Sequence, residues 1–334
     1  MNYETLIKKK LELNIRTEQI SGLDYEAMYK KMLLIRRFEE GAAKLYRQGD
    51  IAGFCHLYIG QEAIVVGLKQ FLNAKDLMIT TYRDHGHMLA CDMEPNGVMA
   101  ELTGRAGGFS KGKGGSMHMF SKEKGFMGGH GIVGATVPLG TGMAFSQKYL
   151  ETGGITLAFC GDAAMNQGQV FEAYNLAALW EIPVLYIIED NGYGIGTSQK
   201  RSCAGGPLYK RGEPFGIPGR QVDGMNIDSV LEAAKWGIEY VRNNCKPAII
   251  QFDTYRFRGH SMSDATKLYR PKEEEEHVMQ NRDCLTLLAE KLKLSEQTIN
   301  RLEDEIGKIV DEACEFALNS PEPDASELYT DVYL

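Results

Sequence analysis

The feature that most constrains the fold of this chain is a set of three near-continuous apolar segments, at residues 155–162, 183–191 and 247–255. Such segments are typical of strands buried on both faces of a parallel sheet. A fourth strand candidate spans residues 77–82, and helix candidates span residues 61–72, 136–150, 167–180 and 226–243. Segments that alternate at this spacing predict an α/β fold, with a mainly parallel sheet that is flanked by helices and joined by right-handed crossovers.

The chain divides into three parts of different character. Residues 1–23 are polar, and we expect them to form an arm. Residues 24–271 hold the α/β pattern, which begins with a helix that Asp24 caps and that ends near Gly49. Residues 272–334 form a predicted C-terminal helical tail, in which one helix buries a face made of Ile299, Leu302, Ile306, Ile309, Ala313 and Phe316.

Composition argues against several classes of protein. The 334 residues carry a net charge of −8, whereas binding to nucleic acid needs clustered positive charge. No apolar run reaches the length of about 18 residues that spans a membrane. The seven cysteines are scattered without a C-x-x-C pair, and no targeting segment is recognised, so we expect reduced thiols and a cytoplasmic protein.

Two glycine-rich segments match nucleotide-binding motifs incompletely. Residues 129–134 spell G-x-G-x-x-G, but we expect no strand before them, and the dinucleotide-binding motif requires one. Residues 107–113 nearly spell a P-loop, but Gly114 stands where the motif needs a Ser or Thr that holds magnesium. These mismatches disfavour an NAD-dependent oxidoreductase and an NTP hydrolase.

Polar residues end two of the predicted strands. Asp162 ends the strand at 155–162, and Asn191 ends the strand at 183–191. Ligands bind at the carboxyl ends of strands in open α/β sheets, and these oxygen donors suit magnesium, to which the Tyr193 backbone carbonyl would add a third ligand. The amides of Ala163 and Ala164, near the start of the next helix, would bind an anion. Either residue alone is better explained as a helix cap or a turn residue, but the pair at this spacing favours a metal site.

The same residues belong to longer motifs that carry a resemblance to a known family. The segment from Asp162 to Asn191 resembles the G-D-G…N-N thiamine diphosphate motif. Four further motifs are GFCHLY at 53–58, TYRDH at 81–85, KGGSMH at 113–118 and YRFRGHSMSD at 255–264. Together they resemble the α subunits of the E1 component of 2-oxo acid dehydrogenase complexes, most nearly those that act on pyruvate. The resemblance extends from about residue 24 to the terminus.

This resemblance implies the thiamine diphosphate-binding fold and assigns roles by position. Asp162, Asn191 and the Tyr193 carbonyl would bind Mg²⁺. His56 and His260 would be the catalytic residues, with His56 facing the substrate. The residues that bind thiamine diphosphate would be Tyr82, Arg83, Gly131, Val133, Asp162, Ala163, Ala164, Asn191 and His260.

Two positions depart from the family pattern. Ala163 replaces the second glycine of G-D-G, so either its φ is negative or the loop is strained, although its expected role uses only the backbone amide. Asp190 replaces the first asparagine of N-N, but the metal ligand in the family is the second, which is present as Asn191.

The resemblance also implies the activity and the partners. We expect thiamine diphosphate-dependent oxidative decarboxylation of pyruvate, with reductive acetylation of the lipoyl group of the E2 component. The glutamate that contacts the aminopyrimidine comes from a β subunit in this family, so we expect a heterotetramer of two α and two β subunits, and the lipoyl domain of E2 as a second partner. The alternatives are the α subunits of acetoin dehydrogenase and of branched-chain 2-oxo acid dehydrogenase, or a non-catalytic scaffold subunit.

Overall fold

The computed structural model describes residues 20–264 and 268–333 of the chain. Its centre is a six-stranded sheet in the order β2-β1-β3-β4-β8-β7, in which all neighbouring strands run parallel. A small antiparallel pair, β5 and β6, follows β4. The strands are β1 (Leu77–Thr81), β2 (Phe126–His130), β3 (Thr156–Gly161), β4 (Val184–Asp190), β5 (Tyr193–Gly194), β6 (Thr197–Ser198), β7 (Gly219–Asp223) and β8 (Ala248–Asp253).

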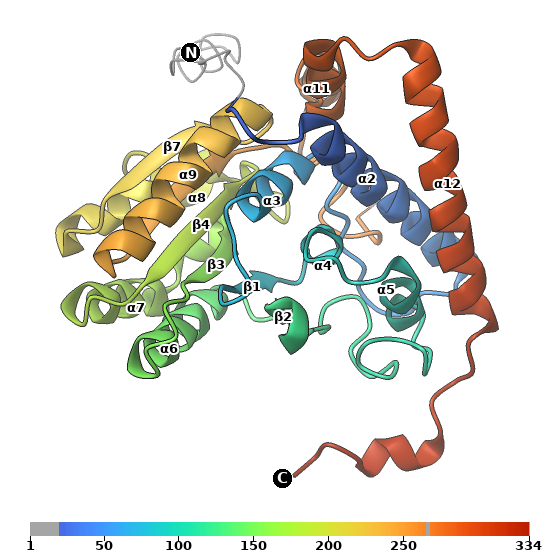
Figure 1. Cartoon of the computed structure of the whole chain (residues 1–334), viewed down its shortest axis with the longest axis horizontal. Helices are drawn as coiled ribbons and strands as arrows, with labels where there is room; N and C mark the ends of the chain where they lie inside the picture. The colour runs from blue at the N-terminus through green and yellow to red at the C-terminus, as the bar shows by residue number, and fades with distance from the viewer. Residues whose placement is uncertain (1–19, 265–267, 334) are drawn as a thin grey trace.

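Helices flank this sheet on both faces, which confirms the predicted α/β class (Figure 1). The α-helices are α2 (Tyr25–Gln48), α3 (Glu62–Lys69), α4 (His85–Ala90), α5 (Pro95–Leu102), α6 (Thr136–Tyr149), α7 (Gly168–Leu179), α8 (Gln199–Ser202), α9 (Ile227–Asn244), α10 (Lys272–Asn281), α11 (Cys284–Leu292) and α12 (Glu296–Asn319). The described residues also form the 3-10 segments η1 (Lys122–Lys124), η2 (Asp162–Asn166), η3 (Leu208–Phe215) and η4 (Ala325–Tyr329). No helix in the described part of the chain is long and apolar enough to cross a membrane.

Strand β3 explains why the central segments are apolar throughout. Leu157 and Phe159 join the hydrophobic cluster on the side of α2, α3 and α9, whereas Ala158 and Cys160 join the cluster beneath α6 and α7. Both faces of the strand are therefore buried, and this favours apolar side chains along it, although Thr156 at its start is polar and also buried.

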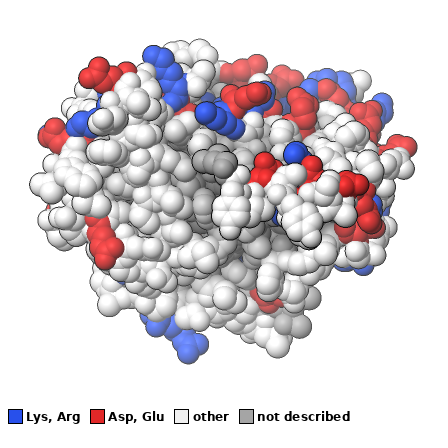
Figure 2. All heavy atoms as spheres, turned by 90° about the horizontal axis from the view of Figure 1, so that it is seen from below, with Lys and Arg blue, Asp and Glu red and all other residues white. Residues whose placement is uncertain are grey.

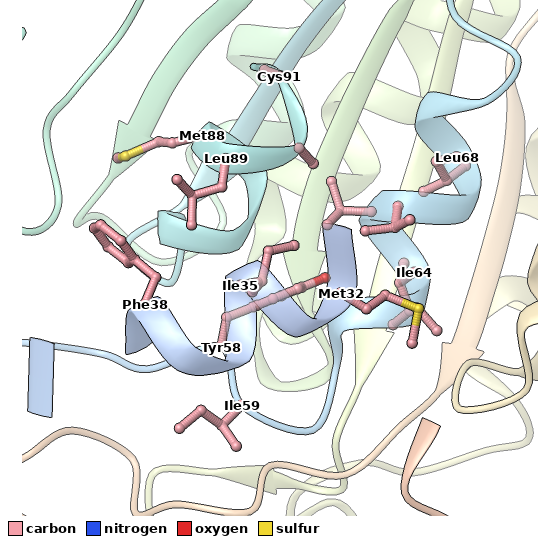
Figure 3. Close-up of a cluster of buried hydrophobic side chains, with 14 of the residues drawn as sticks. Met32, Ile35, Phe38, Tyr58, Ile59, Ile64, Leu68, Met88, Leu89 and Cys91 are labelled. Carbon is pink, nitrogen blue, oxygen red and sulfur yellow. The ribbon is translucent and has the colours of Figure 1, made fainter. Parts of the chain in front are cut away.

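The first described helix, α2, begins and ends at the residues predicted from the sequence. The Asp24 carboxylate caps its start by accepting a hydrogen bond from the Ala27 amide at 2.9 Å. Gly49 ends it with a φ of +91°, a conformation that favours glycine. The apolar face of α2 packs with α3, α4 and Tyr58 in the cluster that Figure 3 shows.

The C-terminal part is helical, as predicted, but the buried face of α12 differs in part from the prediction. Leu302, Ile306 and Ala313 are buried as expected, whereas Phe316 is 42% exposed. Val310 and Ala317 complete the buried stripe, because they continue the spacing of three or four residues that places side chains on one helix face. This face packs against α2 and α5. The predicted arm at residues 1–23 lies almost entirely outside the described residues.

Two strands of the sheet were not predicted, and one of them corrects an argument made above. Strand β2 runs through Gly129 and His130, so a strand does enter the G-x-G-x-x-G segment, and α6 follows at Thr136. The expected absence of a strand was therefore wrong. Both β2 and β7 lie at the edges of the sheet, where glycine and polar residues are tolerated and the apolar pattern is weak.

Candidate functional site

A cavity of about 910 Å³ lies at the carboxyl ends of β1, β3 and β4. Its size is that of a pocket for a small molecule or cofactor. Strands β1 and β4 both neighbour β3 in the sheet, so residues that follow these strands meet there although they are far apart in the sequence. All the site residues predicted from the sequence line this cavity: His56, Tyr82, Arg83, Gly131, Val133, Asp162, Ala163, Ala164, Asn191, Tyr193 and His260.

Asp162 lines this cavity with a carboxylate of which one oxygen has no hydrogen-bond partner among the described residues. The residue begins η2 directly after β3 and is 2% exposed. The oxygen without a partner is Oδ2. Burial, and next the negative charge of Asp190, raise the pKa of Asp162 to about 7. A bound cation would favour the ionised form and satisfy the oxygen, so Asp162 fits a metal ligand.

Asn191 and Tyr193 follow β4 at the same edge of the sheet. The side-chain amide of Asn191 donates to Oε1 of Gln61 at 3.1 Å, so its oxygen is the atom left for a ligand. That oxygen accepts from the Tyr193 amide at 3.4 Å. The Tyr193 carbonyl accepts from Nη1 of Arg256 at 3.4 Å. These oxygens supply the donor types that a magnesium ion prefers.

Two buried guanidinium groups lie in the cavity, those of Arg83 and Arg256. Arg83 donates to the backbone carbonyls of Leu57 at 2.8 Å and His260 at 2.7 Å, and Arg256 donates to the Tyr269 hydroxyl at 3.1 Å. Neither forms an ion pair with a described residue. Burial, followed by the charge of Arg256, lowers the pKa of Arg83 to about 10. Two buried cations without a carboxylate partner are the electrostatic signature of an anion site.

His56, Tyr82 and His260 form an aromatic cluster beside these arginines. The ring centroids of His56 and Tyr82 are 4.3 Å apart, and those of His56 and His260 are 5.2 Å apart. Burial, followed by the charge of Arg83, lowers the pKa of His56 to about 2 and that of His260 to about 3. Both imidazoles are therefore neutral near pH 7, and each has a buried Nδ1 without a partner among the described residues.

Comparisons with known proteins identify the family. A sequence model described as "Dehydrogenase E1 component" matches residues 30–326. The chain belongs to the dehydrogenase E1 component family. It is 54% identical over 310 residues to the pyruvate dehydrogenase E1 component subunit alpha of Rhizobium meliloti strain 1021, covering 92% of this chain and 89% of the relative.

Two further relatives also match most of this chain. The protein of the same name from Zymomonas mobilis is 52% identical over 308 residues, which cover 91% of this chain and 87% of the relative. The mitochondrial protein from Dictyostelium discoideum is 46% identical over 312 residues, which cover 92% of this chain and 82% of the relative. Membership of the E1 family confirms the resemblance seen in the sequence and rules against the NAD-dependent alternative.

The dehydrogenase E1 component family depends on thiamine diphosphate, and the donor set of this cavity fits that cofactor. The unsatisfied oxygen of Asp162 lies in the same cavity as the two unpaired guanidinium groups, as a bridging metal and a diphosphate require. Ala163 lies within η2 and does not have a positive φ, so the alanine in the G-D-G position is not strained.

Arg256, Gln61 and Glu189 are among the residues that line the E1 cavity without a predicted role. Arg256 follows β8 as Asp162 follows β3, so its position after a strand was a usable signal. Gln61 and Glu189 carried no such signal, because their importance comes from contacts with distant residues. Gln61 accepts from Asn191, and Glu189 accepts a hydrogen bond from the buried Tyr58 hydroxyl.

Proposed function

We propose that this chain is the α subunit of a pyruvate dehydrogenase E1 component. In this role it would take part in the oxidative decarboxylation of pyruvate and the reductive acetylation of the lipoyl group of E2. The acetyl group would join one sulfur of the lipoyl disulfide, and the other sulfur would become a thiol. The names of relatives that are about half identical over most of the chain support this activity. The observation that carries the proposal is the unsatisfied Oδ2 atom of Asp162 in one cavity with two arginines that have no carboxylate partner among the described residues.

The chain's own residues would hold the cofactor through its charged end. Asp162, Asn191 and the Tyr193 carbonyl would coordinate Mg²⁺, which in turn would bind the diphosphate. The remaining contacts to the diphosphate would come from the guanidinium groups of Arg83 and Arg256. Tyr82 and the amides of Ala163 and Ala164 would add polar contacts, and the backbone at Gly131 and Val133 would meet the aminopyrimidine.

His56 and His260 would handle protons near the reacting atoms. When bound, thiamine diphosphate supplies the carbanion that attacks the keto carbon and the ring that accepts the electrons. A neutral imidazole can accept a hydrogen bond or a proton at Nδ1, and both histidines have this atom free of a described partner. We assign His56 to the substrate side and His260 to the cofactor side. Negative charge from a diphosphate beside Arg83 would raise both pKa values towards the range useful for proton transfer.

The surface supports a partner subunit next to this site. Seen from below the view of Figure 1, the molecule shows a broad face on which Lys, Arg, Asp and Glu are sparse (Figure 2). Helices α6 and α7 expose apolar side chains, among them Phe145, Tyr149 and Leu179, and the loop before α6 exposes Ile132 at the cavity. Exposed apolar surface of this kind is characteristic of obligate subunit interfaces. We propose that an E1 β subunit covers it and supplies the glutamate for the aminopyrimidine, within a heterotetramer that serves the lipoyl domain of E2.

The test is a reconstitution with a panel of substrates. The chain is co-expressed with the E1 β subunit of its own organism and assayed, with Mg²⁺ and thiamine diphosphate, on pyruvate, branched-chain 2-oxo acids and acetoin. We expect the highest kcat/KM for pyruvate and little activity from the α chain alone. Preference for acetoin or a branched-chain acid would overturn the substrate assignment. Full turnover after His56→Ala and Arg83→Ala substitutions would indicate a scaffold subunit. The cytoplasmic location stays a prediction.

A further inference from the structure

A glycine-rich loop, residues 107–118, wraps around the carboxylate of Glu101. Glu101 belongs to α5 and is fully buried. Its Oε2 atom accepts from the amides of Ser110 at 2.8 Å and Gly112 at 2.9 Å. Its Oε1 atom accepts from the amides of Gly114 at 2.7 Å and Gly115 at 3.2 Å. Backbone amides that converge in this way form an anion-binding nest, and here the anion is a side chain of the same chain.

This contact explains the segment that nearly spells a P-loop. A Cβ atom on Gly108 would lie 2.6 Å from the Glu101 Cα, so a side chain there would clash with α5. Gly112 has a φ of +76°, a conformation that favours glycine. The glycines therefore let the loop close around Glu101, and the space where a nucleotide phosphate would sit is filled by its carboxylate.

The far end of the loop reaches the cofactor cavity. Met117 lines the cavity, and its backbone carbonyl lies 2.6 Å from where a Cβ atom on Gly129 would be. Nδ1 of His118 lies 3.3 Å from the Gly129 carbonyl oxygen. Gly129 belongs to β2, whose end leads directly to Gly131 and the cavity. The segment that follows the Glu101 nest therefore packs against β2, which leads to the backbone proposed to meet the aminopyrimidine.

The loop is also anchored from the other side by a buried histidine. Nε2 of His85 lies 2.7 Å from the Ser116 hydroxyl, and Nδ1 of His85 lies 2.7 Å from Oε2 of Glu39. All three residues are buried. Ser116 is thereby fixed between the nest at residues 110–115 and Met117. A displacement of the nest should therefore also displace Met117 at the wall of the cavity.

We propose that Glu101 is a positioning residue for the cofactor site, acting through the loop at 107–118 on the backbone at 129–133. The identity of the ligand rests on the proposed function. The loop backs the wall proposed for the aminopyrimidine, whereas Arg83 and Arg256 hold the diphosphate end. Loss of the Glu101 carboxylate should therefore weaken binding of the whole cofactor and spare binding of its charged end.

The test compares two ligands on the full chain co-expressed with its β subunit. Calorimetry with saturating Mg²⁺ measures the Kd of thiamine diphosphate and of inorganic pyrophosphate for the unaltered protein and for Glu101→Gln. We expect the Kd of thiamine diphosphate to rise about tenfold and that of pyrophosphate to stay within about twofold. An unchanged Kd for thiamine diphosphate, or an equal rise for both ligands, overturns the inference. If Glu101→Gln does not fold, Glu101→Asp takes its place, because it withdraws the carboxylate by one methylene. The same two Kd values are then measured, and the same results overturn the inference.

A matched control lies on the outer side of the same loop. Glu327 is paired with Lys113 at 3.0 Å at the surface, so Glu327→Gln removes a carboxylate that contacts the loop without entering the nest. We expect both Kd values to stay within about twofold, because exposed ion pairs contribute little. A rise for thiamine diphosphate equal to that of the Glu101 variant would contradict a specific role for the nest.

A second readout needs no cofactor and separates this inference from the proposed function. Lys111 is exposed on the loop, and trypsin cleavage after it reports how well the loop is ordered. We expect Glu101→Gln to speed this cleavage in the cofactor-free protein, and an unchanged rate would refute the ordering role. If the unaltered protein binds no thiamine diphosphate, the proposed function fails, and the cleavage rates still decide whether Glu101 orders the loop.

Discussion

The side-chain amide of Asn191 donates a hydrogen bond to Oε1 of Gln61 at 3.1 Å, and this contact sets which atom of Asn191 faces the cavity. Gln61 lies directly before α3 and is 1% exposed. With the amide nitrogen bound to Gln61, the oxygen of Asn191 is the atom presented to a metal. Partners of this kind orient ligands and tune metal affinity although they do not touch the ion.

Replacing Gln61 is therefore expected to weaken magnesium binding. Gln61→Leu keeps much of the side-chain volume but removes the acceptor, so Asn191 loses its fixed orientation. We expect the concentration of Mg²⁺ that supports half-maximal cofactor binding to rise by roughly 10-fold to 100-fold. Titration of Mg²⁺ into protein with thiamine diphosphate measures this value. Gln70→Leu, at the exposed end of the same helix, is the control, and an unchanged Mg²⁺ requirement for Gln61→Leu would contradict the assignment.

Arg256 is expected to recognise the diphosphate. Arg256→Gln should raise the Kd of thiamine diphosphate by at least about tenfold, because a charge-assisted contact to phosphate in a buried site is lost. Binding of thiamine, which lacks the phosphates, should not change. Calorimetry with both ligands tests this, and Arg258→Gln, at an exposed position two residues away, serves as the control. Equal losses for both ligands would show that Arg256 only supports the fold.

The depressed pKa of His56 predicts a pH dependence of stability. Burial keeps this imidazole neutral in the folded chain down to about pH 2, whereas it protonates in the unfolded chain near pH 6.5. The unfolded state therefore binds more protons below pH 6.5, and the free energy of unfolding falls as the pH falls, by up to about 1.4 kcal/mol per pH unit for this group.

Urea denaturation of the cofactor-free chain between about pH 7 and pH 5 measures this effect. We expect His56→Asn to lose stability less steeply towards low pH than the unaltered chain, by up to one proton in the slope. Gln280→Asn, at an exposed position on α10, removes no titratable group and should keep the original slope. A slope for His56→Asn equal to that of the unaltered chain would mean that His56 is not held neutral.

The apolar surface of α6 predicts the effect of a charged substitution on assembly. Phe145 is 45% exposed, so Phe145→Glu should leave the fold of the α chain intact while placing a charge in the proposed interface. We expect dissociation of the heterotetramer at micromolar concentration, measured by sedimentation velocity. Tyr329→Glu, on η4, is the control because this position is also exposed. Full assembly of the Phe145 variant would place the β subunit elsewhere.

Much of the fold followed from the sequence because central strands and capped helices carry local signals. Strands β3, β4 and β8 are apolar at almost every position, and Asp24 and Gly49 mark the ends of α2. Edge strands β2 and β7 were not predicted, because glycine and polar residues interrupt the apolar run that marks the central strands. Their pairing also depends on neighbours that are distant in the sequence. Phe316 was misplaced on α12 because the periodicity alone did not fix which neighbouring stripe faces the core.

In the candidate site, too, some residues could be predicted from the sequence and others could not. Asp162 and Asn191 were found because a polar residue at the end of a buried strand is itself a signal. Gln61 and Glu101 were not, because each acts through a hydrogen bond to a segment that the sequence does not show to be near. For Glu101 the four amides come from the loop at 110–115, and only the folded arrangement reveals that the carboxylate fills it.

The central claim, that Asp162 anchors a metal which holds a diphosphate in this cavity, is tested most directly by calorimetry on the complete assembly. Thiamine diphosphate is titrated with Mg²⁺ present and after its removal by a chelator, for the unaltered protein and for Asp162→Asn. We predict binding by the unaltered protein only when Mg²⁺ is present, and loss of that binding in Asp162→Asn. Binding that is equally tight without Mg²⁺, or that survives the Asp162 substitution, would contradict the claim.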